Sequence, residues 1–210
     1  MIKILDYGMG NTKSILNMIN KINANAETCS KVSELETASA IILPGVGSFN
    51  NVMIKLRELG LIKSLYRKVI LEKVPFLGIC LGMQILFEKS EESNLPGLGW
   101  IKGNVRRFNF LDFKLHTNLK IPHMGWNVVN PKICHNLFSG LEDKGRFYFL
   151  HSYHVNCSEP SNILATSNYG YQFTCAVRHN NIWGVQFHPE KSHRFGIQLF
   201  KNFLKEINNA

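Results

Sequence analysis

Short apolar segments alternate with helical segments through the first half of the chain, and this alternation limits the folds available to it. Residues 2–5, 40–43 and 75–79 are short and mainly apolar, as strands buried on both faces of a sheet are. After each of them, apolar residues recur at the spacing of a helix with one buried face. This order predicts an α/β fold in which a mostly parallel, open sheet carries helices on both faces.

The second half of the chain has alternating, aromatic segments that add antiparallel strands to this sheet. Residues 100–108, 125–129, 146–155, 173–178 and 182–187 are predicted to be strands. Helices are predicted over residues 80–89 and 197–207. No repeat, low-complexity tract or linker divides the sequence, so residues 1–210 are predicted to form one domain.

Composition argues against several classes of protein. The five cysteines are scattered without a C-x-x-C pair, which argues against a disulfide framework and favours a reducing cytoplasm. No run of eighteen apolar residues occurs, so a membrane span is not expected. The net charge of +9, from 24 Lys and Arg against 15 Asp and Glu, includes no dense basic stripe. Nucleic-acid binding is therefore not expected.

The sharpest local signal is Gly78-Ile79-Cys80-Leu81-Gly82, between a predicted strand and a predicted helix. Flanking glycines permit the tight turn of a nucleophile elbow, which lifts the central side chain out of the sheet. The N–H groups at the start of the helix favour a thiolate over a thiol. A cysteine in such a place is by itself more often a packed core residue, but the paired glycines favour a nucleophile at Cys80.

A thiolate nucleophile needs an acid–base partner, and His188 is the best candidate among the eight histidines. It follows the predicted strand 182–187, which would bring it to the same edge of the sheet as Cys80. Because Pro189 fixes the local backbone, Glu190 can accept from one ring nitrogen and leave the other free to exchange a proton. Alone, His-Pro-Glu would indicate a surface turn; together with the elbow it indicates a triad.

A glycine-rich loop, Pro44-Gly45-Val46-Gly47, follows a neighbouring predicted strand. Such loops let backbone N–H groups approach a ligand closely, and an amide of this loop would form an oxyanion hole together with that of Leu81. A simple strand-ending turn explains the same residues equally well, and the spacing alone does not separate the two interpretations.

These elements, in this order, resemble the triad-type (class I) glutamine amidotransferases, and among them the glutaminase subunits of imidazole glycerol phosphate synthase, an enzyme of histidine biosynthesis. The resemblance covers nearly the whole chain, and its motifs are specific in combination rather than one by one. They are DYGMGN (6–11), PGVG (44–47), GICLGMQ (78–84), PHMGWN (122–127), FYFLHSY (147–153) and GVQFHPEKS (184–192).

The resemblance implies roles for individual residues. Cys80 would attack the side-chain amide of glutamine to give a thioester and ammonia, His188 would carry protons, and Glu190 would orient His188. The oxyanion would be stabilised by the amides of Val46 and Leu81. Glutamine would be seated by Gly47, Gln84, Ser152 and Tyr153. The ammonia would pass to a (β/α)₈-barrel cyclase partner, with contacts at or near Asn11, Trp126 and Lys191. No cofactor is implied.

Other functions fit parts of the sequence. The same chemistry can supply ammonia for the amidation of cell-surface sugars, and the identity of the accompanying synthase would discriminate between the two pathways. A non-catalytic regulatory subunit would not need the intact triad, and a papain-like protease would have a different architecture. Gly8-Met9-Gly10 hints at a dinucleotide-binding turn, but Lys13 stands where the third glycine should be.

A metal site is not expected. His151 and His154 would point to opposite faces of one strand, and the Cys134-His135 pair has no further ligands at zinc spacing. His154 also stands where the family more often has another aromatic residue, a difference that would affect packing near the substrate.

Overall fold

The computed structural model describes residues 1–111, 119–132, 135–141 and 145–208. Within these residues the helices are α1 (Thr12–Lys21), α2 (Phe49–Glu58), α3 (Leu61–Leu65), α4 (Leu81–Gln84) and α5 (His193–Asn208). The strands are β1 (Ile2–Leu5), β2 (Ala26–Cys29), β3 (Ala40–Gly45), β4 (Phe76–Cys80), β5 (Phe87–Ser90), β6 (Ile101–Arg107), β7 (His123–Val128), β8 (Asn130–Pro131), β9 (Arg146–His151), β10 (Tyr153–Cys157), β11 (Ile163–Tyr169), β12 (Tyr171–His179) and β13 (Ile182–Val185).

A large mixed sheet forms the centre of the molecule. Strands β2, β1, β3, β4 and β13 are adjacent in that order and run parallel. On the other side of β13 the sheet continues through β12, which pairs antiparallel with β13, β10 and β11. The predicted α/β class, with a parallel sheet and added antiparallel strands, is confirmed.

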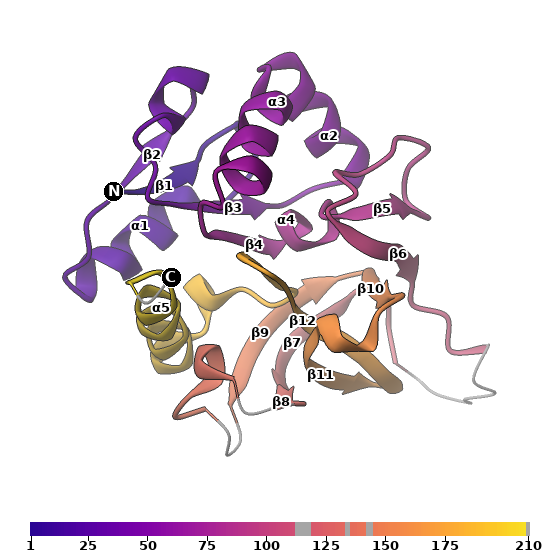
Figure 1. Ribbon diagram of the computed structural model, residues 1–210. Coiled ribbons are helices and arrows are strands. Elements are labelled where there is room, and N and C mark those ends of the chain that lie inside the picture. Colours follow the sequence, from indigo (N-terminus) through magenta and orange to yellow (C-terminus); the bar gives the residue numbers. More distant parts are fainter. Residues whose placement is uncertain (112–118, 133–134, 142–144, 209–210) are drawn as a thin grey trace.

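Helices cover both faces of the parallel part, as Figure 1 shows, with α2 and α3 on one side and α1 and α5 on the other. Each helix buries one apolar stripe. Ile15, Met18 and Ile19 of α1 pack with α5 in one core, and Val52 and Leu56 of α2 belong to the other. Ser48 caps α2 by accepting a hydrogen bond from the Asn51 amide at 3.3 Å.

A second, two-stranded sheet of β7 and β9 packs against the core on the α5 side. The chain leaves this sheet at His151 and enters the large sheet at Tyr153, with Ser152 between them. The change of sheet bends the chain at the FYFLHSY motif, and it places consecutive residues of this motif beside different neighbours.

Two local predictions are wrong, and two strands were not predicted, for reasons that lie outside the local sequence. The predicted helix 80–89 ends at Gln84, because the carbonyls of Ile85 and Leu86 accept from Leu98 at 2.7 Å and Trp100 at 2.8 Å, and β5 then pairs with β6. The predicted strand 146–155 is two strands, β9 and β10. The polar edge strand β2 was not predicted, and neither was β11.

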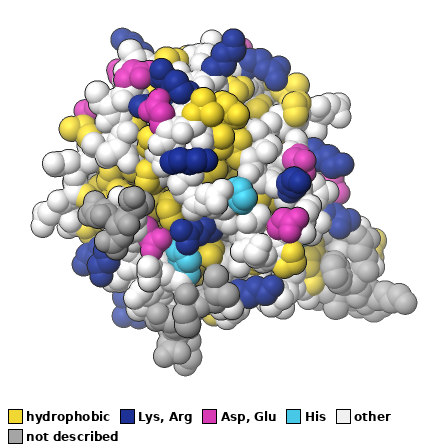
Figure 2. Space-filling model, viewed as in Figure 1, with side chains coloured by type: hydrophobic (Ala, Val, Ile, Leu, Met, Phe, Trp, Pro, Cys, Tyr) yellow, Lys and Arg dark blue, Asp and Glu magenta, His cyan; other side chains and the backbone are white. Residues whose placement is uncertain are grey.

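Positive charge is dispersed on the face of the molecule shown in Figure 2. On the face shown in Figure 2, Lys and Arg side chains lie over many elements and are interspersed with acidic ones. No helix in the described ranges combines the length and the apolar composition needed to cross a bilayer.

Candidate active site

Cys80 ends β4 in a strained turn that opens directly into α4. Its φ of 55° lies in the left-handed region, which residues with a side chain seldom adopt. A Cβ added at Gly82 would lie 2.0 Å from the Leu43 carbonyl oxygen, and one at Gly78 would lie 2.4 Å from the Gly82 oxygen. Only glycine fits at these two positions, so the flanking glycines do permit the elbow, as the sequence indicated.

A cavity of about 270 Å³ opens at this turn. Most of the predicted site residues line it, and they come from the loop after β3, the end of β4, α4, the link between β9 and β10, the start of β10 and the segment after β13. The lining includes Val46, Gly47, Cys80, Leu81, Gln84, Ser152, Tyr153, His188 and Lys191. Leu81 is the first residue of α4, so its amide has no acceptor in a preceding helical turn. The predicted oxyanion and glutamine-seating residues are therefore gathered at one place.

His188 and Glu190 form a buried pair beside Cys80. The Nδ1 of His188 lies 2.9 Å from Oε1 of Glu190, and the two side chains are 3% and 2% exposed. Burial lowers the pKa of His188, but the neighbouring Cys80 and Glu190 together outweigh burial, so the pKa is raised. Since a carboxylate only accepts, Nδ1 carries a proton and Nε2 remains for exchange. The structure therefore brings Cys80 together with His188 and Glu190, which lie more than 100 residues later in the chain.

Backbone contacts that the sequence did not reveal hold His188 in place. Its amide donates to the Tyr148 carbonyl at 2.8 Å. The Ser192 hydroxyl donates to the His188 carbonyl at 2.6 Å and accepts from the Tyr148 amide at 3.0 Å. Ser192 is fully buried. The final serine of the GVQFHPEKS motif therefore ties the triad turn to β9.

Tyr7 supports the glycine-rich loop in a similar way. Its hydroxyl donates to the Pro44 carbonyl at 2.7 Å. Burial raises the pKa of Tyr7, with a smaller contribution from Cys80, so the hydroxyl stays protonated as a donor. Gly47 has a φ of 103°, and a Cβ there would lie 2.8 Å from the Met9 methyl. The DYGMGN motif thus packs against the loop that carries Val46.

A chain of hydrogen bonds behind the cavity converges on the Tyr153 carbonyl. His151 Nδ1 lies 2.7 Å from this oxygen and must donate to it, so Nε2 of a neutral His151 accepts from Nδ1 of His123 at 3.0 Å. His123 Nε2 then accepts from the side-chain Nδ2 of Asn127 at 3.2 Å. Burial lowers the pKa of His123 to about 4 and that of His151 well below its usual value. Both imidazoles are neutral at pH 7.

These neutral histidines should make the fold sensitive to acid. The unfolded chain takes up protons below its ordinary histidine pKa of about 6.5, whereas folded His123 does so only near pH 4. The free energy of unfolding should therefore fall as the pH drops from about 6.5 to 4, by up to about 1.4 kcal/mol per pH unit for each histidine. Urea unfolding at several pH values should show a shallower fall in His123→Gln than in the wild-type protein.

The exposed histidine of β12 provides the control for this measurement. His179→Gln removes an imidazole outside the core, so its slope against pH should match the wild-type slope. Equal slopes for His123→Gln and the wild-type protein would contradict the prediction.

Of the three residues predicted at the partner contact, one lines the cavity and two do not. Lys191 lines it, with Nζ 5.7 Å from the centre of the Tyr148 ring. Trp126 on β7 is 40% exposed and stacks on His193 at 5.5 Å. Asn11 stands at the start of α1, next to Gly10, whose added Cβ would lie 2.9 Å from Pro44.

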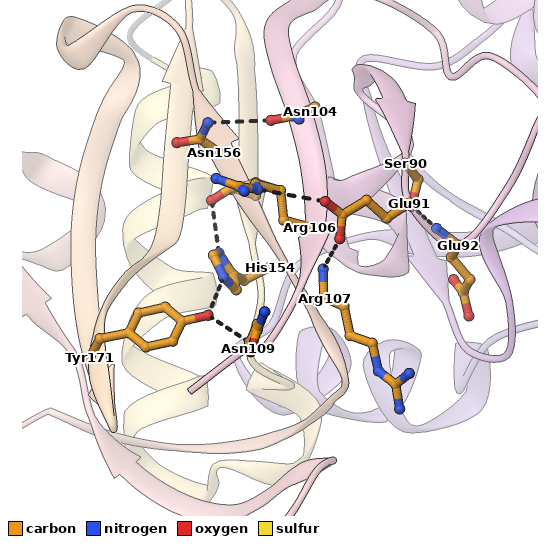
Figure 3. A network of polar contacts seen from close by, with 11 residues as sticks. Ser90, Glu91, Glu92, Asn104, Arg106, Arg107, Asn109, His154, Asn156 and Tyr171 are labelled. Carbon is orange, nitrogen blue, oxygen red and sulfur yellow. Dashed lines mark hydrogen bonds and ion pairs between the residues drawn. The ribbon is translucent and has the colours of Figure 1, made fainter. Parts of the chain in front are cut away.

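A second cavity, of about 720 Å³, is larger but lacks this chemistry. Arg106, Arg107 and His154 line it, whereas Cys80 and His188 do not. As Figure 3 shows, His154 points toward Tyr171, with Nε2 2.9 Å from the hydroxyl, and Glu91 pairs with the Arg106 side chain at 3.6 Å and accepts from the Arg107 backbone amide at 2.8 Å. Burial lowers the pKa of His154. His154 therefore lines this cavity and not the smaller one.

The two histidines that could suggest a metal site instead pack against an aromatic side chain. His151 and His154 belong to different strands, and both rings contact Phe108, at 5.2 and 4.9 Å. The expectation that they point to opposite faces of one strand is therefore wrong. No group of three or more His, Cys, Asp or Glu that could hold a metal ion occurs among the residues that the structure describes, and Cys134 lies outside them.

Known proteins are similar to this chain in sequence and in fold. The family described as glutamine amidotransferase class-I matches residues 3–207. The imidazole glycerol phosphate synthase subunit HisH 2 of Methanococcus maripaludis is 52% identical, covering 98% of this chain and 100% of that protein. The HisH 2 subunit of Pseudomonas aeruginosa is 46% identical, covering 99% and 100%.

Solved structures agree at the level of the fold. A crystal structure of a glutamine amidotransferase has a TM-score of 0.74 at 20% identity, over 99% of this chain and 98% of that chain. The structure of PurLQS from Thermotoga maritima has a TM-score of 0.71 at 17% identity, over 98% of each chain. The full-length sequence matches carry the assignment further: the chain belongs to the class I glutamine amidotransferases, in the family of the HisH subunits of imidazole glycerol phosphate synthase.

Proposed function

We propose that Cys80, His188 and Glu190 are the catalytic triad with which this chain hydrolyses glutamine to glutamate and ammonia. One observation carries the proposal. Cys80 stands in a left-handed elbow at the mouth of a cavity, next to a buried histidine whose second nitrogen is held by a carboxylate. Nucleophilic catalysis by a thiol needs these three parts within reach of one another.

The proposed reaction has two halves. The Cys80 thiolate attacks the side-chain carbonyl carbon of glutamine, and the oxygen of the tetrahedral intermediate becomes negative. Nε2 of the His188 imidazolium gives its proton to the leaving nitrogen, so that ammonia and a thioester form. His188 then takes a proton from water, which attacks the thioester and releases glutamate. Glu190 keeps the imidazole in one orientation and stabilises its charged form throughout.

The cavity lining supplies the remaining roles in this proposal. The amides of Val46 and Leu81 stabilise the oxyanion, a contribution that is typically worth about 3–4 kcal/mol for each well-placed donor. Glutamine is seated by Gly47, Gln84, Ser152 and Tyr153, all of which line the cavity. Residues 1–210 act as one glutamine amidotransferase domain, because the large sheet joins strands from both halves of the chain.

The ammonia is consumed by a (β/α)₈-barrel cyclase in histidine biosynthesis, in the cytoplasm. Exposed apolar side chains near the cavity support a docked partner: Val46 is 43% exposed, Met124 66% and Leu150 39%. Asn11, Trp126 and Lys191 contribute to this contact. The names of the relatives favour the histidine pathway over sugar amidation, and the intact triad argues against a non-catalytic regulatory subunit.

Glutaminase activity should be low in the isolated chain and should rise at least about tenfold when the cyclase binds. A glutaminase that ran without its partner would waste glutamine. The measurement is glutamate release by the purified chain, alone and with the purified cyclase, together with pull-down of the cyclase from solution. Comparable turnover with and without the bound cyclase would contradict the partner dependence. Recovery of a sugar amidotransferase as the bound partner would change the pathway.

A further inference from the structure

Gln186 is a fully buried polar residue that touches the proposed nucleophile. It follows β13 directly, two residues before His188, and its exposed fraction is 0%. Its side-chain nitrogen lies 3.6 Å from Cys80 Sγ, and its side-chain oxygen lies 3.0 Å from Nε2 of Gln84. Both polar atoms of the amide are therefore used in hydrogen bonds, as buried polar groups require.

The direction of these hydrogen bonds is fixed by a backbone carbonyl. Nε2 of Gln84 also lies 3.0 Å from the Tyr153 oxygen, which can only accept, so this atom of Gln84 must be the nitrogen. The atom of Gln186 that meets this nitrogen must then be its oxygen. The remaining NH₂ group of Gln186 consequently faces Cys80, and it donates to the sulfur rather than accepting from it.

We propose that Gln186 is a positioning residue that stabilises the Cys80 thiolate and fixes the amide of Gln84 in one orientation; this rests on the proposed role of Cys80. A donor aimed at the sulfur favours its charged form. Nε2 of Gln84 is held by two acceptors, and neither of these bonds uses its Oε1. That oxygen accepts a hydrogen bond from the side-chain amide nitrogen of a glutamine bound in the cavity.

A packing role alone does not account for the residue. The neighbours Val185 and Phe187 are apolar and completely buried, and an apolar side chain at position 186 would avoid burying an amide. The arrangement also extends behind the site, because the Tyr153 carbonyl accepts from His151 as well, at 2.7 Å. One carbonyl thereby sets the orientation of the groups on both sides of it.

Two substitutions separate hydrogen bonding from shape. Gln186→Leu removes the donor, while Gln186→Glu keeps the shape and places an acceptor against the sulfur. The measurement is alkylation of Cys80 by iodoacetamide as a function of pH, followed on the Cys80 peptide by mass spectrometry. Gln186→Leu should move the midpoint of this profile upward by about one pH unit, and Gln186→Glu by at least as much. Burial raises the pKa of Cys29 and Cys157 to about 12, so these thiols should react little in this range.

Steady-state kinetics with the bound partner supply the second measurement. Both variants should lower kcat/KM for glutamine about tenfold or more, with a rise in KM because Gln84 is no longer held. The matched control is Asn202→Leu, which removes another buried amide, bonded to the Leu137 and Ser139 carbonyls. Its alkylation midpoint should equal that of the wild-type protein.

The outcomes distinguish this inference from the proposed function. Unchanged midpoints in both Gln186 variants would overturn the inference. A wild-type midpoint in Gln186→Glu alone would also overturn it, because that result would assign Gln186 a packing role. A midpoint that shifts as far in Asn202→Leu would also overturn it. Persistent glutaminase activity in Cys80→Ala would instead remove the proposed function on which it rests.

Discussion

Replacing Cys80 with alanine should remove glutamine-dependent product formation from the assembled enzyme and leave the reaction with added ammonia unchanged. Without the sulfur no thioester can form, and the oxyanion donors alone give only a small residual rate. Loss of a nucleophile that works within a triad typically lowers the rate by about 10⁴-fold or more. The measurement compares cyclase product formed from glutamine with that formed from a high concentration of an ammonium salt.

The chain offers a matched cysteine as the control. Cys29 is buried and free at the end of β2, on the edge strand of the large sheet, and it does not line the cavity. Cys29→Ala should keep both activities. Equal loss of the glutamine-dependent and ammonia-dependent reactions in Cys80→Ala would indicate damage to the assembly and would count against Cys80 as the nucleophile.

Replacing Glu190 with glutamine should lower kcat with glutamine by about 10³- to 10⁴-fold while the fold remains intact. The side chain is 2% exposed, and only its Oε1 has a hydrogen-bond partner among the described residues. The isosteric amide keeps the shape but removes the charge that, together with Cys80, raises the pKa of His188. The imidazolium that must protonate the leaving nitrogen would then be less stable.

Steady-state rates with glutamine would measure the loss of kcat, and thermal unfolding of the complex would show whether the fold remains intact. Glu206 on α5 supplies a similar carboxylate, 10% exposed and 3.9 Å from the Nε2 of His135, outside the cavity. Glu206→Gln should retain the wild-type rate. A Glu190→Gln enzyme that turned over glutamine at the wild-type rate would show that His188 needs no carboxylate partner.

Local sequence sufficed for the parallel half of the fold, apart from the polar edge strand β2, because the other elements there are specified by their own residues. The runs that became β1, β3 and β4 are mainly apolar and buried on both faces, and α1 and α2 carry single buried stripes. β5 could not be predicted in this way, since its strand form depends on pairing with β6. The break at Ser152 depends similarly on two separate sheets.

The same difference between local and long-range contacts decides which residues of the candidate site could be predicted. The elbow and the His-Pro-Glu turn are short motifs whose chemistry follows from neighbouring residues, so Cys80, His188 and Glu190 could be predicted. Gln186 and His123 act through partners far away in the sequence, such as Gln84 and His151. The one local signal for Gln186 was a polar residue between the apolar Val185 and Phe187.

The position of β13 has a consequence for biosynthesis on the ribosome. This strand lies between β4 and β12, although it follows both of them in the chain. A nascent polypeptide can therefore assemble its early parallel strands, but it cannot close the sheet until β13 has been translated. Such long-range pairing is slow compared with local folding. During synthesis Cys80 is therefore made well before His188 and Glu190, which follow β13 in the chain.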